Sequence, residues 1–356
     1  MIESENIFNT QYIILYCSSL LFFLLFFIED NFKKKYKLDQ LRLVYVYFFS
    51  FLFLLIFGLR SFDVGIDNTV YLYFFSNKSI VQNDFGFDIL TRFLRLVTND
   101  RGYLFTIASI YMITFLLFIT NWSIHKKVIV YLFFMYVSLF FFKNMGMNVI
   151  RQGIANMIFL LAIMFFEKNK KILAIALFAL AFSFQATVII PIFVWFTVKF
   201  INFRTSIYIL VICSLLSILG IGLEKVTSVI PIFNKLFENR FDSYLNNSNT
   251  NYITGFRGSF FVFNWFFVLA GLYIKKNIYN SVLQEKILKS FIVLSGVFFL
   301  YFNIPYSDRI GLFSWIFIPL LFVPLFQNKK VSFELKSGTV FIFIFMFIYF
   351  VLFPSK

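Results

Sequence analysis

Two carboxylates and an arginine stand close together in a polar stretch of an otherwise apolar chain. The stretch begins at Gly58 and contains Arg60, Asp63 and Asp67, and its glycines allow tight backbone turns. A guanidinium binds anions, and a neighbouring carboxylate can accept a proton from a hydroxyl group. The segment therefore predicts an anion site with a general base beside it. The alternative is a loop whose own salt bridges satisfy these charges.

A second polar group follows helical spacing further along the chain. Asn148, Arg151, Gln152 and Asn156 fall on one face of a predicted helix. Exposing such a face to lipid is costly, so it must face protein or a water-filled cavity. The face is either a polar contact between helices or part of a binding site.

These residues must be positioned by membrane helices. Of 356 residues, 60% are hydrophobic and only 14% are charged, whereas soluble domains carry about 25% charged residues. A spanning helix needs roughly 20 residues. The sequence predicts one all-α integral membrane domain, 1–356, of about twelve such helices. They are expected at 12–28, 43–59, 103–120, 128–142, 149–166, 172–183, 186–198, 206–223, 260–274, 290–303, 310–326 and 339–353. The stretch 172–198 is divided because polar residues at 183–187 and Pro191 interrupt it.

The basic residues predict the orientation of the chain. The net charge of +15 lies in short tracts between apolar runs, which is typical of membrane loops and excludes nucleic acid as a partner. With the loop 29–42 inside, 17 of 22 lysines are cytoplasmic and both termini lie outside. Eight of the ten arginines are then outside: Arg60, Arg92, Arg95, Arg101, Arg151, Arg240, Arg257 and Arg309.

Arginines on the outer face indicate an anionic ligand there, because guanidinium binds phosphate and carboxylate through two hydrogen bonds. For each arginine, the alternative is an outer carboxylate or a lipid phosphate as partner. Asp308-Arg309 opens the eleventh predicted helix just after Pro305. That pair is either a local ion pair or a functional one.

Two outer loops, 60–102 and 224–259, are long enough to be functional. In the first, apolar residues recur at helical spacing over 86–98, which predicts a short amphipathic helix on the membrane surface. The second contains an asparagine-rich tract suited to a mobile lid. Cys17 and Cys213 lie in apolar runs and the single histidine, His125, lies in a basic loop. We therefore expect no disulfide framework, metal site or histidine-dependent triad.

These segments, in this order, resemble the O-antigen and exopolysaccharide repeat-unit polymerases of the EpsG/Wzy type. The resemblance covers about 45–325. It rests on Gly58-Leu59-Arg60, Val64-Gly65-x-Asp67 with Tyr71, Asp84-x-Gly86-Phe87, Ile150-Arg151-Gln152-Gly153-Ile154-Ala155, the basic turn 167–171 and Asp308-Arg309. Two positions depart from the family: Ile66 replaces a common threonine, and Phe184-Gln185-Ala186 replaces Phe-His followed by a small residue. Gln185 can hydrogen-bond a sugar but cannot take up a proton near neutral pH.

The resemblance implies a helical bundle similar to the GT-C glycosyltransferases. It also implies a metal-independent, cofactor-free transferase at the outer face of the bacterial plasma membrane. Its substrates would be oligosaccharides linked to undecaprenyl diphosphate, and a chain-length regulator would be a possible protein partner. We expect the diphosphate on Arg60, Arg151 and Arg309, with Arg240 next, and expect Asp63 or Asp67 to act as the base. Asn148, Gln152, Gln185 and Tyr71 are the expected sugar ligands. Arg151, with the two aspartates, is an expected catalytic residue.

Two other functions remain as alternatives. An O-antigen ligase would share the helices and the donor, but ligases of that kind usually rely on a histidine in the large outer loop, and 224–259 has none. A lipid-linked oligosaccharide flippase or another transporter is the second alternative. Transporters are commonly built from internal repeats with polar residues at the bilayer midplane, whereas the polar groups here stand at outer helix ends. The sequence leaves open which sugars are joined, and whether the product is O-antigen, capsule or another exopolysaccharide.

Overall fold

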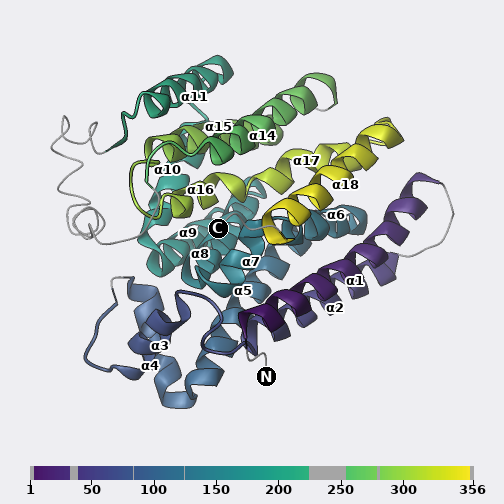
Figure 1. Cartoon of the computed structure of the whole chain (residues 1–356). Coiled ribbons are helices and arrows are strands. Elements are labelled where there is room, and N and C mark those ends of the chain that lie inside the picture. Colours follow the sequence, from purple (N-terminus) through teal and green to yellow (C-terminus); the bar gives the residue numbers. More distant parts are fainter. Residues whose placement is uncertain are drawn as a thin grey trace. The chain divides into compact units, whose positions relative to one another are not determined.

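The computed structural model describes residues 4–32, 39–82, 84–123, 125–223, 254–278 and 281–352, and these ranges consist of helices joined by turns and loops. No strand occurs in these ranges, so the all-α prediction is confirmed for them. The helices in chain order (Figure 1) are α1 (Glu5–Asn31), α2 (Asp39–Gly58), α3 (Asn68–Ser76), α4 (Phe85–Val97), α5 (Asp100–Trp122), α6 (Lys126–Val137), α7 (Phe140–Met147), α8 (Ile150–Glu167), α9 (Lys171–Phe184), η1 (Ala186–Val188), α10 (Ile189–Thr197), α11 (Phe203–Ile218), α14 (Gly258–Asn277), α15 (Val282–Leu300), α16 (Asp308–Trp315), α17 (Ile318–Gln327), α18 (Phe333–Phe347) and η2 (Ile348–Leu352).

Within the described ranges, seven helical segments are long and apolar enough to cross a membrane, which makes this a multi-pass membrane protein. They are α1, α2, α5, α8, α14, α16 with α17, and α18 with η2. Each of the twelve predicted apolar segments falls on helical structure. However, α9, α10 with η1, and α11 are shorter apolar helices. In addition, α15 carries three charged residues, Glu285, Lys286 and Lys289. The number of twelve crossings stays a prediction.

The predicted interruption between 183 and 187 is confirmed. Helix α9 ends at Phe184, and Gln185 is extended, with φ −154° and ψ 103°. The chain then makes one turn of 3₁₀ helix before α10 begins. This break places Gln185 at the end of a helix, where its side chain can reach a neighbouring element.

A second interruption was not predicted. The segment 128–142 was expected to be one span, but α6 and α7 meet at an angle of 75°. At the end of α6, the Ser138 hydroxyl donates to the Phe134 carbonyl at 2.8 Å and lies 3.0 Å from the Tyr16 hydroxyl. Such bonds from serine to the preceding turn bend helices. The expectation of an unbroken helix was wrong because one serine in an apolar run gives little sequence signal.

The helices divide into two compact units. Unit 1 comprises Met1–Ile189 and Leu325–Lys356, and unit 2 comprises Ile190–Pro324. In unit 1, α8 packs against α5 and α9, and every residue from Gln152 to Met164 is buried. A helix that is buried on all sides is a core helix, so α8 is the element around which unit 1 is built. In unit 2, α11, α14 and α16 pack against α15.

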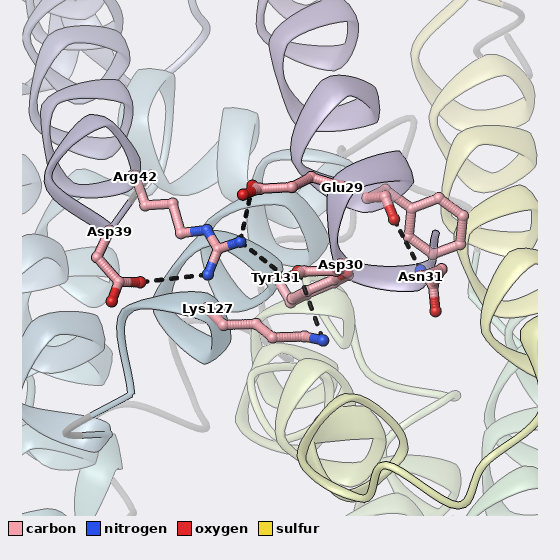
Figure 2. A network of polar contacts seen from close by, with 8 residues as sticks. Glu29, Asp30, Asn31, Asp39, Arg42, Lys127 and Tyr131 are labelled. Carbon is pink, nitrogen blue, oxygen red and sulfur yellow. Dashed lines mark hydrogen bonds and ion pairs between the residues drawn. The ribbon is translucent and has the colours of Figure 1, made fainter. Parts of the chain in front are cut away.

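A network of charged side chains joins the ends of α1, α2 and α6 in unit 1 (Figure 2). Nη2 of Arg42 donates to Glu29 at 3.0 Å and to Asp30 at 2.7 Å. The Tyr131 hydroxyl donates to Asp30 at 3.1 Å, and the Lys127 ammonium lies 3.6 Å from the same carboxylate. The network ties together three helices at the end of the unit that the lysine distribution predicts to be cytoplasmic.

Candidate functional site

Arg151 lies in the first turn of α8 and is held by residues from three other segments of unit 1. Its Nε donates to the Gln185 side-chain oxygen at 2.9 Å, and its Nη1 forms an ion pair with Asp84 at 3.0 Å. The guanidinium carbon lies 5.9 Å from the centre of the Phe87 ring, and the backbone N–H donates to the Tyr71 hydroxyl at 3.4 Å. The side chain is still 24% exposed. Two nitrogens of this arginine are therefore held by protein, while part of its side chain stays accessible to solvent.

Asp84, the residue before α4, is the buried partner of Arg151. Its side chain is 2% exposed, and its second carboxylate oxygen accepts a hydrogen bond from the Ala186 backbone N–H at 3.0 Å. The start of α4 can approach Ser183 this closely because residue 86 is a glycine. A Cβ on Gly86 would lie 2.8 Å from the Ser183 Cβ and 3.1 Å from the Ser183 carbonyl carbon. The start of α4 is therefore fixed on the junction between α9 and η1.

The loop before α3 is tied to the junction between α7 and α8. Asn148 accepts a hydrogen bond from the Ile66 backbone N–H at 2.9 Å and donates one to the Asn144 side chain at 2.9 Å. Gly65 has φ +101°, in the left-handed region that favours glycine. A Cβ at this glycine would lie 2.7 Å from the Asn148 side-chain oxygen. The sequence Val64-Gly65 thus permits the contact that brings this loop to α8.

Arg60 is enclosed by protein and is only 4% exposed. Its guanidinium donates to the Phe57 carbonyl, to the Asn68 side-chain oxygen at 2.6 Å and to the Met147 carbonyl at 3.1 Å. Burial lowers the pKa of Arg60 to about 10, because taking a charge out of water disfavours the charged form. Arg60 fastens the end of α2 to the start of α3 and to the end of α7, and a ligand would reach its nitrogens only if these contacts opened.

The two predicted bases differ in their surroundings. Asp63 is exposed and accepts a hydrogen bond from the Ser61 hydroxyl at 3.5 Å. Asp67 is half-buried at the start of α3. An exposed carboxylate is open to a substrate hydroxyl, so the geometry is compatible with Asp63 acting as a base.

The polar face of α8 turns away from the surface, as its cost in lipid requires. Gln152 and Asn156 are both buried, and the Asn156 amide donates to the sulfur of Met145 at 3.8 Å. Gln152 directly follows Arg151 in α8 and is buried within unit 1. Gln152 and Asn156 therefore face protein, while Arg151 on the same face is partly exposed.

The other two predicted arginines lie outside the described part of unit 1. Arg309 lies at the start of α16 in unit 2, and its guanidinium carbon is 4.9 Å from the Tyr306 ring centre. Tyr306 itself has φ +61°. Arg240 lies outside the described residues. Among the described residues, no group of three or more His, Cys, Asp or Glu side chains could hold a metal ion.

The contacts above bring together one group of residues, the Arg151 cluster: Arg60, Asn68, Tyr71, Asp84, Asn148, Arg151 and Gln185. Two of them, Asp84 and Asn68, were not selected from the sequence as site residues. Asp84 stands in the motif Asp84-x-Gly86-Phe87, so a signal was present, although nothing in it names Arg151 as the partner. Asn68 follows Asp67 directly and gives no separate signal. Of the predicted site residues, the contacts link Arg60, Tyr71, Asn148, Arg151 and Gln185 through shared elements of unit 1.

The sequence model of the EpsG family matches residues 43–355, which is nearly the whole chain. The chain belongs to the EpsG family. This is a family of Wzy-type polymerases. The EpsG match begins within α2 and contains every residue of the Arg151 cluster, whereas α1 lies before it. No curated protein and no solved structure matches the chain.

Proposed function

We propose that this EpsG protein is a polysaccharide repeat-unit polymerase. It transfers a glycan from undecaprenyl diphosphate to the non-reducing-end hydroxyl of a lipid-linked repeat unit at the outer face of the bacterial plasma membrane. The observation that carries the proposal is Arg151: it is anchored through Nε and Nη1 at the end of a core membrane helix, yet 24% of its side chain is exposed. A guanidinium presented in this way fits a lipid diphosphate.

In the proposed reaction, the bond between the anomeric carbon and the diphosphate oxygen breaks, and a bond from the acceptor oxygen to that carbon forms. The acceptor proton passes to a carboxylate, for which Asp63 or Asp67 is proposed. The diphosphate leaves with the electron pair, and Arg151 stabilises its charge as it develops. A leaving group stabilised in this way needs no metal ion, so we propose a metal-independent glycosyltransferase.

The other candidate residues take roles suited to their surroundings. Arg60 is enclosed, so it supports the site through its charge and by fastening α2, α3 and α7. Arg309 and Arg240 remain proposed diphosphate ligands. Asn148, Gln152, Gln185 and Tyr71 remain proposed sugar ligands, of which Gln185 and Tyr71 already contact Arg151.

We further propose that α4 lies on the outer membrane surface and that both units belong to one integral membrane domain. The exposed residues of α4 include an apolar stripe at helical spacing: Phe85, Ile89, Phe93 and Leu96. On a soluble protein, such a stripe would be a liability. In the headgroup region of a bilayer, it is the ordinary face of an interfacial helix.

The proposed orientation predicts where reporter tags will be found. Tags after Lys127 and Asn280 should report the cytoplasm, and tags near Asn83 and Asn249 should report the outside, because cytoplasmic loops collect lysine. Paired reporters, one active only in the cytoplasm and one only outside, measure this for each position. Two or more tags on the opposite side would overturn the orientation and the outer location of Arg151.

Deletion of the gene provides the test of the function itself. A strain without the polymerase should accumulate single lipid-linked repeat units exposed on the outer face, since flipping continues while joining stops. Extracted lipid-linked oligosaccharides, labelled from outside intact cells, measure both length and side. Single units trapped inside would indicate the alternative flippase. Full-length chains left on the lipid carrier would indicate the alternative ligase.

A further inference from the structure

A buried carboxylate lies beside the arginine that the proposed function depends on most. One oxygen of Asp84 pairs with Nη1 of Arg151 at 3.0 Å, and the other accepts from the Ala186 backbone N–H at 3.0 Å. Because both oxygens are held and the side chain is 2% exposed, the carboxylate cannot swing away to solvent. Its negative charge is a fixed part of any anion site built on Arg151.

Asp84 lies at the N-terminal end of α4. The residue immediately precedes α4, and the positive end of a helix dipole stabilises an anion. The contact of Gly86 with Ser183 keeps this helix end against the α9 junction. Asp84 is also a poor candidate for the base, since a base must reach a substrate hydroxyl and both of its oxygens are engaged inside the protein.

A diphosphate bound to the exposed part of Arg151 would share the guanidinium with Asp84. Two anions on one cation repel each other, so each binds less tightly than it would alone. Each transfer in the proposed polymerase leaves one lipid diphosphate behind, and that product must depart before the next donor binds.

We propose that Asp84 is the resident counter-ion of Arg151, and that it weakens diphosphate binding enough for the spent lipid carrier to leave after each transfer. This inference rests on the proposed function, because it assumes that Arg151 binds the diphosphate. It assigns Asp84 a positioning and affinity-setting role that acts through Arg151.

The test is the binding of undecaprenyl diphosphate to the purified full-length protein in nanodiscs. Asp84→Asn should bind this probe about tenfold more tightly, because a like charge is removed from the site, while turnover with lipid-linked repeat units falls. Asp84→Ser is the second variant: it also removes the charge, and serine is a favoured residue before a helix. Combining Asp84→Asn with Arg151→Ala should abolish the gain in affinity, since the effect passes through the guanidinium.

Asp88→Asn is the matched control. Asp88 is a buried carboxylate one turn further along α4, but its partners are Nε of Arg92 at 2.8 Å and the Gln82 backbone N–H at 3.1 Å. The affinity of the Asp88→Asn variant for undecaprenyl diphosphate should equal that of the native protein. Unchanged or weaker binding in the folded Asp84 variants would overturn the counter-ion role. No binding by the native protein would instead overturn the proposed diphosphate site, and the inference with it.

Discussion

Replacing Arg151 with lysine is expected to shorten or remove the glycan ladder while leaving the amount of membrane protein unchanged. Lysine carries a point charge, so it cannot hold Gln185 through Nε and Asp84 through Nη1 and still present a further N–H edge. Each lost charge-assisted hydrogen bond costs about 1.5–3 kcal/mol, enough to slow turnover about tenfold or more. Ladder length in a deletion strain carrying Arg151→Lys, with the protein level in the same membranes, measures this.

Arg92→Lys is the matched control. Arg92 lies in the same predicted outer loop and pairs with Asp88 at 2.8 Å, but its side chain is 51% exposed. Lysine keeps the positive charge beside Asp88, and an ion pair with a half-exposed arginine contributes only about 0–1 kcal/mol, so the ladder should stay normal. A normal ladder in Arg151→Lys would show that the arginine is dispensable. Loss of the protein together with the ladder would show that its role is structural.

The environment of Arg151 was partly predictable. An arginine on a helix face that cannot meet lipid needs an anion nearby, and the structure provides Asp84 at 3.0 Å. The partner could not be identified in advance, because the two residues are far apart in sequence and the outer loop 60–102 offers other carboxylates. Charge balance predicts the type of partner, and only the packing of α4 against α9 selects this one.

The contacts of Arg60 could not be predicted from the sequence, for a different reason. The family resemblance predicts it as a diphosphate ligand, which stays a prediction. Its two Nη atoms donate to two backbone carbonyls and to the Asn68 side chain. Every residue has a carbonyl, so this kind of enclosure leaves no trace in residue type. The placement of Gly65 beside Asn148 likewise follows from backbone geometry.

The helices were predictable from apolar runs in the sequence, whereas the points at which helices are interrupted were only partly predictable. Twelve apolar segments were placed from hydropathy, and each falls on helical structure. The interruption at 183–187 was visible because several polar residues and Pro191 gather there. The bend between α6 and α7 depends on hydrogen bonds of Ser138 to Phe134 and Tyr16. The second partner is distant in sequence, so the bend was not visible.

Removing the Arg42 guanidinium is expected to have the largest effect on stability. Its side chain is 10% exposed, and it is bonded to the carboxylates of Glu29 and Asp30, each 8% exposed (Figure 2). Arg42→Ala leaves these buried charges without their main partner, which costs about 3–5 kcal/mol. Thermal unfolding of the purified protein and its level in membranes should both show the loss.

Asp39→Ala is the control for the same network, because it removes a partner of Arg42 at 3.3 Å whose side chain is 67% exposed. Its effect should be about 0–1 kcal/mol. Arg42→Met combined with Glu29→Leu should recover part of the stability, because Asp30 keeps Tyr131 and Lys127 as partners and no buried charge is left unpaired. If Arg42→Ala unfolds at the same temperature as the native protein, the network does not stabilise unit 1.

Arg42 lies far from the Arg151 cluster, so its substitution is expected to change stability but not catalysis. Helix α2 runs from Asp39 to Gly58, so 16 residues of helix, about 24 Å, separate Arg42 from the loop at the other end that begins the Arg151 cluster. Turnover per folded molecule should therefore be normal in Arg42→Ala, and the ladder should weaken only as the protein level falls. In Arg151→Lys, the opposite pattern is expected, with normal protein and slow turnover. A slow but fully folded Arg42→Ala protein would mean that the two ends of α2 are coupled during the transfer reaction, contrary to the separate roles assigned to them.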